Sequence, residues 1–112
     1  MTEVKNSKQY DLEDRTLKFA KEVFKFVSAL PKTVASIEIA KQLMRSAGSI
    51  GANYIEANES LSRKDFILRI KICRKEAKET RYWLNILEEN GKLTQEALEL
   101  MKIFGAILEK SK

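Results

Sequence analysis

The residues best suited to a chemical role in this chain are basic and lie in one segment. Between Arg63 and Arg81 there are eight Lys or Arg and three Asp or Glu residues, and this excess of five equals the +5 of the whole chain. Outside the segment, 13 basic residues balance 13 acidic ones (21 − 8 and 16 − 3). Apolar residues recur every three or four positions within it, which predicts an amphipathic helix with a cationic outer side. The expected partner is a polyanion.

The basic side chains are predicted to form a ridge on this helix. At about 100° per residue, a row of lysines lies opposite the apolar seam and a row of arginines lies between the lysines and the core. The candidate nucleic-acid-binding residues are Arg63, Lys64, Lys71, Arg74, Lys75, Lys78 and Arg81. The alternative is a merely solvated face, with Glu76 and Glu79 offsetting part of the charge through contacts such as Glu79 with Lys75. Confinement of the whole net charge to one helix favours binding.

Candidates for catalysis are few. The chain has no His, the usual general base at neutral pH and a common metal ligand. Its single Cys, Cys73, falls in the predicted apolar seam, where a thiol usually packs without reacting. The run from Gly48 to Gly51 lacks the spacing and the lysine of a phosphate-binding loop. The sequence therefore predicts a protein that is not an enzyme and that needs no metal or cofactor.

Three polar residues interrupt otherwise apolar helical rows: Asn53, Glu56 and Glu79. They are interpreted as a buried or interfacial hydrogen-bond set with Arg45 or Tyr54, which satisfies polar groups and fixes register. The alternative is a carboxylate pair that performs acid–base chemistry or holds a divalent cation. Because the carboxylates lie on different predicted helices, without histidine or an Asp-rich loop, the structural interpretation is favoured.

The elements that position these residues are predicted to be helices. One Pro and four Gly in 112 residues leave few helix breakers, and no segment sustains a period of two. We expect a frayed segment over residues 1–10 and helices over about 11–30, 34–59 and 63–90, followed by a fourth helix. The predicted caps are Asp11 or Asp14, Thr33, Ser62 and Thr94, with Asn90-Gly91 ending the third helix. The predicted fold is therefore all-α. Because short connections place successive helices side by side and antiparallel, we expect an up-down-up-down antiparallel four-helix bundle over residues 11–112.

Apolar spacing predicts which faces of the helices are buried. The third helix should bury Phe66, Ile70, Cys73, Ala77, Thr80, Leu84 and Leu87. The first should bury one face containing Leu17, Ala20, Val23, Phe24, Val27 and Leu30. Small residues over 46–52 should let a neighbouring backbone approach closely. A second apolar row on the third helix, which one bundle core need not bury, is predicted to be an oligomer interface: Leu68, Ile72, Trp83 and Ile86.

Residues 43–87 resemble a known family. The resemblance rests on the segments LMRSAGSIGANYIEANES and KEAKETRYWL. Its central positions are Arg45, Asn53, Glu56, Glu79 and the run Tyr82-Trp83-Leu84. Together with the Leu30-Pro31-Lys32 turn, the pattern is similar to that of the 23S ribosomal RNA intervening-sequence proteins. This resemblance implies a four-helix bundle, a ring-shaped homopentamer and a basic surface for nucleic acid. Related accessory proteins of diversity-generating retroelements engage a reverse transcriptase and RNA.

Two functional classes follow from the sequence. The first is a non-catalytic oligomer that binds RNA or DNA through the basic face with little sequence specificity, because no recognition face rich in Asn or Gln and no ladder of exposed aromatic residues accompanies the lysines. The second is an oligomeric protein-binding scaffold or accessory subunit, for example of a reverse transcriptase. The absence of a signal-like N-terminus and of a long apolar run predicts a cytoplasmic protein without a membrane partner.

Overall fold

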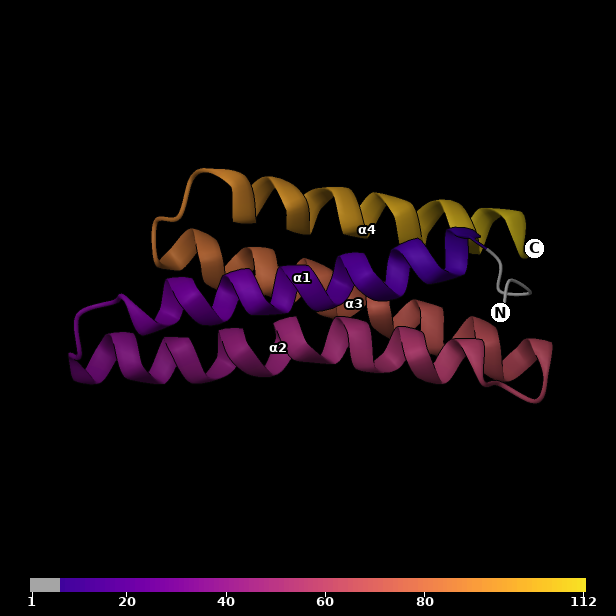
Figure 1. Ribbon diagram of the computed structural model, residues 1–112, viewed down its shortest axis with the longest axis horizontal. Helices are drawn as coiled ribbons and strands as arrows, with labels where there is room; N and C mark the ends of the chain where they lie inside the picture. Colours follow the sequence, from indigo (N-terminus) through magenta and orange to yellow (C-terminus); the bar gives the residue numbers. More distant parts are fainter. Residues whose placement is uncertain (1–6) are drawn as a thin grey trace.

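The computed structural model describes the chain from residue 7 to residue 112, with side chains described from Asp11 onward. Its helices are α1 Ser7–Ser28, α2 Val34–Asn58, α3 Arg63–Ile86 and α4 Lys92–Lys110, and residues 7–112 contain no strand. Successive helices run antiparallel, with the α1–α2 and α3–α4 loops at one end of the bundle and the α2–α3 loop at the other (Figure 1). The predicted all-α, up-down-up-down four-helix bundle is confirmed.

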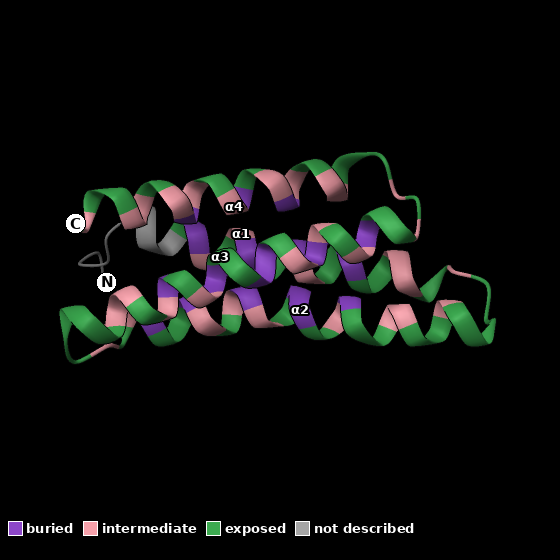
Figure 2. Cartoon of the chain, turned by 180° about the vertical axis from the view of Figure 1, so that it is seen from behind, coloured by how far each residue is buried: buried purple, intermediate pink, exposed green. Residues whose placement is uncertain are grey.

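The helices pack unequally. The contact between α2 and α3 is the most extensive, followed by α3 with α4 and α1 with α2, whereas α1 and α4 meet only sparsely. Buried residues face the middle of the bundle and exposed residues cover its outside (Figure 2). Side chains from all four helices form the core: Leu12, Phe19, Val23, Leu43, Ala47, Ile50, Tyr54, Ala57, Ile70, Cys73, Ala77, Leu84, Ala97, Leu100 and Phe104.

The predicted seam of α3 is confirmed. Its five central members, Ile70, Cys73, Ala77, Thr80 and Leu84, are completely buried, and Phe66 and Leu87 at the two ends are half-buried. The buried hydroxyl of Thr80 lies 2.7 Å from the carbonyl oxygen of Glu76 and 2.8 Å from Oγ of Ser46 on α2. These hydrogen bonds offset the cost of burying the hydroxyl and join α2 to α3.

The predicted inner face of α1 is partly wrong. The buried positions are Leu12, Thr16, Phe19 and Val23, whereas Leu17 is 53% exposed and Phe24 is 61% exposed. The buried residues follow a 4-3-4 spacing, and Leu17 and Phe24 lie about one third of a turn away from that line. Because α2 contacts α1 at Thr16 and α4 contacts it at Arg15, the bundle does not enclose both apolar rows.

The predicted helix ends are correct in part. Thr33 caps α2, since its side chain accepts from the Ser36 amide, and Ser62 caps α3 by accepting from the Asp65 amide at 3.0 Å. The helix α1 begins at Ser7, so Asp11 and Asp14 lie inside the helix and do not cap it. Residues 1–6 of the segment expected to be frayed lie outside the described residues, and the division of the chain at residue 10 stays a prediction.

The α3–α4 connection differs from the predicted one. The helix α3 ends at Ile86, and Glu88 adopts a left-handed conformation with φ 60°. Its amide donates to the Asn85 carbonyl and the Glu89 amide donates to the Leu84 carbonyl, both at 3.0 Å, which is the Schellman pattern. Asn90-Gly91 therefore follows the helix end and does not form it.

The start of α4 also differs. Gly91 occupies the N-cap position, and Thr94 lies inside the helix. The Glu89 side chain accepts hydrogen bonds from the amides of Gly91 at 3.2 Å, Leu93 at 3.3 Å and Thr94 at 2.9 Å. A carboxylate from the loop thus satisfies the first free amides of α4, which begins before Thr94 and not after it as predicted.

Candidate nucleic-acid interface

The basic residues of α3 occupy its outward side. Lys64, Lys71, Lys75 and Lys78 are exposed, so the predicted ridge of lysines forms one line along the helix. The arginines lie on the shoulder that faces α4: the Arg63 guanidinium donates to the Ser111 carbonyl, Arg74 lies over Gly105, and Arg81 is half-buried.

Both acidic residues in the middle of α3 point toward α2. Glu76 is only 6% exposed, and its Oε1 accepts from Nη1 of Arg45 at 3.3 Å. Glu79 accepts from Nη2 of the same guanidinium, and not from Lys75 as predicted. The nearest approach of a ridge lysine to either carboxylate is the 3.8 Å separation between Lys75 Nζ and Glu76 Oε2. The acidic charge of α3 is therefore largely segregated from its lysine ridge.

The polar residues predicted to form one set lie in separate places. Arg45 and Glu79 pair directly, whereas Asn53 accepts from Nη1 of Arg69 at 2.9 Å and donates to the Ser49 carbonyl at 2.9 Å. Glu56 is exposed. The sequence did not predict that Glu76 would bind Arg45 or that Arg69 would bind Asn53. The signal for both contacts is that Glu76 and Arg69 lie on the side of α3 opposite the predicted arginine row.

The predicted interface row on α3 has two apolar ends. Leu68 is 54% exposed and Ile86 is 45% exposed, while Ile72 and Trp83 are half-buried. Nε1 of Trp83 donates to Oε2 of Glu79 at 3.0 Å, which joins the indole to the Arg45 pair. Apolar side chains are thus exposed at both ends of the row, and the Glu79 carboxylate lies between them.

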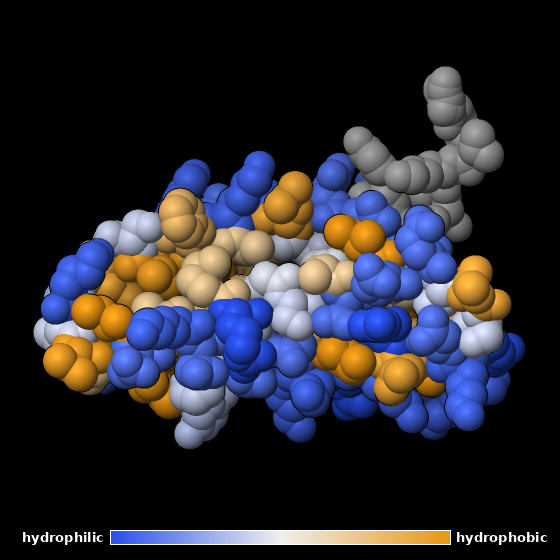
Figure 3. All heavy atoms as spheres, turned by 90° about the horizontal axis from the view of Figure 1, so that it is seen from below, coloured by the Kyte–Doolittle hydropathy of each residue, from blue (hydrophilic) through white to orange (hydrophobic). Residues whose placement is uncertain are grey.

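A second apolar surface lies on the other side of α2, which sequence reasoning missed. Its exposed large members are Leu17 and Phe24 of α1 and Ile37 and Ile55 of α2. Pale and orange spheres extend along this face from the end with the α1–α2 loop toward the middle of the molecule (Figure 3). The signal that could have found it is the seven-residue spacing of Leu17 and Phe24, offset from the true core row.

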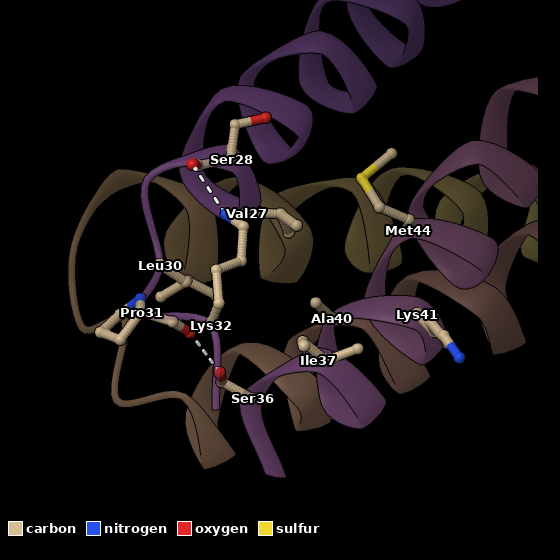
Figure 4. Close-up of a pocket in the computed structure, with 10 residues that line it drawn as sticks. All are labelled: Val27, Ser28, Leu30, Pro31, Lys32, Ser36, Ile37, Ala40, Lys41 and Met44. Carbon is tan, nitrogen blue, oxygen red and sulfur yellow. Dashed lines mark hydrogen bonds between the residues drawn. The ribbon is translucent and has the colours of Figure 1, made fainter. Parts of the chain in front are cut away.

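This apolar surface contains a groove of about 510 Å³ beside the α1–α2 loop. Val27, Leu30, Ile37 and Met44 surround it (Figure 4). Among the residues that line it, the titratable side chains are Lys32 and Lys41; Lys32 donates to the Ser28 carbonyl at 3.4 Å. The lining of the groove thus combines apolar side chains with two lysines and contains no carboxylate.

The thiol of Cys73 is unsuited to catalysis. It is completely buried and lies 3.5 Å from the Ile50 carbonyl oxygen. Burial raises the pKa of the Cys73 thiol to about 12, so the reactive thiolate is scarce at neutral pH.

Within the part of the chain that the structure describes, no group of three acidic or cysteine side chains could hold a metal ion. None of the described helices is both long and apolar enough to cross a membrane.

Comparisons with known proteins agree with this architecture. Residues 8–108 match the model of the family described as 23S rRNA-intervening sequence protein. A similar solved structure is that of a protein with unknown function from the S23 ribosomal protein family of Bacteroides thetaiotaomicron VPI-5482. It is 33% identical in sequence, with a TM-score of 0.80 over 91% of this chain and 98% of that chain. No curated protein matches the sequence significantly. With its family model matched over nearly the whole bundle, the chain belongs to the 23S rRNA-intervening sequence protein family.

Proposed function

We propose that this protein is a non-catalytic oligomeric bundle that binds nucleic acid, RNA or DNA, through the basic face of α3 with little sequence specificity. The observation that carries the proposal is the segregation of charge on α3. Its exposed lysines form one line, while Glu76 and Glu79 are paired with Arg45 of α2. The family described as 23S rRNA-intervening sequence protein is consistent with an RNA partner.

The arrangement suits phosphate contacts. Lys71, Lys75 and Lys78 occur at four- and three-residue spacing, so their ammonium groups project from one side of the helix over roughly 10 Å of its length. Arg74 and Arg81 can add bidentate phosphate contacts from the α4 side. Contacts of these kinds fix the position of a strand without reading its bases.

Oligomerisation would multiply this charge. The apolar ends of the α3 row, Leu68 and Ile86, lie on one side of α2, and the surface containing Leu17 and Phe24 lies on the other. Two different apolar patches on one chain are what a head-to-tail ring requires. A homopentamer, as the family resemblance implies, would carry a net charge of 5 × 5 = +25 and present several ridges to one strand.

Fluorescence anisotropy with a labelled RNA oligonucleotide tests the proposal. If about four phosphates are neutralised, log K should fall against log salt with a slope of about −3 to −4. The variant Lys71→Glu, Lys75→Glu, Lys78→Glu should lose most binding. The matched control is Lys18→Glu, Lys25→Glu, Lys92→Glu, which changes the net charge equally on exposed lysines outside α3. Equal loss in both variants, or binding that salt does not weaken, would contradict a role for the α3 ridge.

The assembly part of the proposal needs its own measurement. Light scattering should show an oligomer at micromolar concentration, and Trp83→Ala should weaken assembly by about 2 kcal/mol or more if the indole is a central anchor. Phe24→Ser, on the α1–α2 surface, should do the same if the ring is head-to-tail. A monomeric wild-type protein would exclude multivalent binding.

A second candidate function is a protein-binding scaffold or accessory subunit. The observation that favours it is the exposed apolar surface of α1 and α2, because patches of this kind mark association sites. In that case Phe24→Ser would abolish capture of the protein partner without changing the oligomer mass, and the Lys71, Lys75, Lys78 triple variant would leave capture intact.

A further inference from the structure

We propose that Tyr82 is a base-stacking platform at the end of the lysine ridge and that the nucleic acid held by α3 is single-stranded. This inference rests on the proposed function and deepens it by naming the class of strand. It adds an aromatic residue to a surface for which the sequence predicted phosphate contacts without exposed aromatic residues.

Tyr82 lies in line with the lysines. It follows Lys71, Lys75 and Lys78 with successive spacings of four, three and four residues, so all four side chains occupy one side of α3. The Tyr82 side chain is 59% exposed. Four residues correspond to roughly 6 Å along a helix, which keeps Lys78 within reach of the phosphate of a nucleotide whose base covers the Tyr82 ring.

The Tyr82 ring is supported from the α2 side. It packs edge to face against Trp83, with ring centroids 5.2 Å apart and an interplanar angle of 69°. Trp83 in turn donates to Glu79 at 3.0 Å, and Glu79 is paired with Arg45 of α2. This chain of contacts restricts the rotamers of an exposed aromatic side chain, which lowers the entropy cost of binding a planar ligand.

An exposed ring of this kind distinguishes single strands from duplexes. In a duplex each base is already stacked between its neighbours, so its faces are not available to a protein side chain. An unpaired base offers its π-face to an aromatic ring, and every base can do so. The lysines attract the phosphates of either form, whereas Tyr82 adds affinity only for unpaired bases. The expected ligand is therefore single-stranded RNA or DNA of any sequence.

Anisotropy measurements on the full-length protein with labelled oligouridylate and with a blunt RNA duplex of equal length test this inference. Tyr82→Ala should weaken oligouridylate binding about tenfold, within the range for loss of one stacking contact per site. It should leave duplex binding within about twofold. Tyr82→Phe, which keeps the ring, should retain oligouridylate affinity. Because Trp83 is the only tryptophan, oligouridylate should also quench tryptophan fluorescence, and the duplex should not.

The outcomes separate this inference from the proposed function. Equal losses on both ligands, or no loss on oligouridylate, would show that Tyr82 does not stack on bases while the lysine ridge still binds phosphate. Wild-type protein that binds neither ligand would overturn both proposals. A change in oligomer mass for Tyr82→Ala, with oligouridylate affinity per assembled ring unchanged, would place Tyr82 in a subunit interface and reject its stacking role.

Discussion

Gly51 of α2 lies directly against Thr16 of α1. A Cβ atom placed at Gly51 would be 2.9 Å from Oγ1 and 3.2 Å from Cβ of Thr16. Thr16 is buried, and its hydroxyl hydrogen-bonds to the Leu12 carbonyl at 2.9 Å, so this short side chain has little freedom to move away. The close approach predicted from the small residues of α2 is thus confirmed at a specific pair.

This pair predicts opposite effects for two glycines on one helix. Gly51→Ala should destabilise the protein by about 1–3 kcal/mol, because overpacking exceeds the gain in helix propensity. Gly48→Ala is the matched control: a Cβ atom placed at Gly48 would have no neighbour within 4 Å, so this substitution should stabilise by up to about 1 kcal/mol. Urea unfolding measures both, and Thr16→Ala combined with Gly51→Ala should recover part of the loss. Equal effects at the two glycines would contradict the contact.

The left-handed Glu88 predicts a stabilising substitution. Because its φ is 60° and only glycine adopts this region without steric cost, Glu88→Gly should raise the free energy of unfolding by about 1 kcal/mol. Asn90→Gly, two residues later and without a positive φ, should be neutral or destabilising by about 0.5–1 kcal/mol. Thermal unfolding monitored by circular dichroism distinguishes the two variants.

The Glu89 cap predicts a pH dependence of stability. Burial acts to raise the pKa of this carboxyl, but hydrogen bonds from Thr94, Leu93 and Gly91 outweigh it and hold the pKa below its ordinary value. A group with a depressed pKa in the folded state stabilises the fold above its unfolded pKa of about 4.3 and loses that contribution as pH falls through the folded pKa.

Glu89→Gln therefore should cost about 1 kcal/mol at pH 7, and the difference from wild type should shrink in acid below the unfolded pKa. Urea midpoints measured across this range check the prediction. Glu88→Gln controls for the loss of a neighbouring charge and should show a smaller effect at pH 7. A pH-independent difference for Glu89→Gln would mean that the charge does not contribute to the cap.

The buried thiol predicts protection from modification. Because burial raises the pKa of Cys73 to about 12, a thiol reagent such as DTNB should not react with the folded protein and should react fully in denaturant. Cys73→Ala should lower stability by about 1 kcal/mol through the small cavity that it leaves, and nucleic-acid binding should be unchanged. Rapid labelling of the native protein would contradict the packing of α3.

Local sequence determined the helices, the α3 seam and the basic ridge. The periodic apolar residues determine which side of α3 is buried when other helices pack against it. The lysines lie on the opposite side and are therefore exposed. The caps at Thr33 and Ser62 were predictable because each depends on residues within one turn. The cap of α4 was not, because the helix begins before Thr94 and its first amides donate to Glu89, whose position depends on the path of the α3–α4 loop.

Tertiary structure decided which of two similar rows is buried and where the charges pair. Leu17 and Phe24 are as apolar as the core row of α1, and they remain exposed because α2 and α4 contact other sides of α1, at Thr16 and at Arg15. Glu79 can reach Lys75 within its own helix, yet it pairs with Arg45, whose position depends on the alignment of α2 along α3. Periodicity describes one helix at a time, whereas burial and ion pairing depend on the neighbour that each face meets, so only the packed bundle determines them.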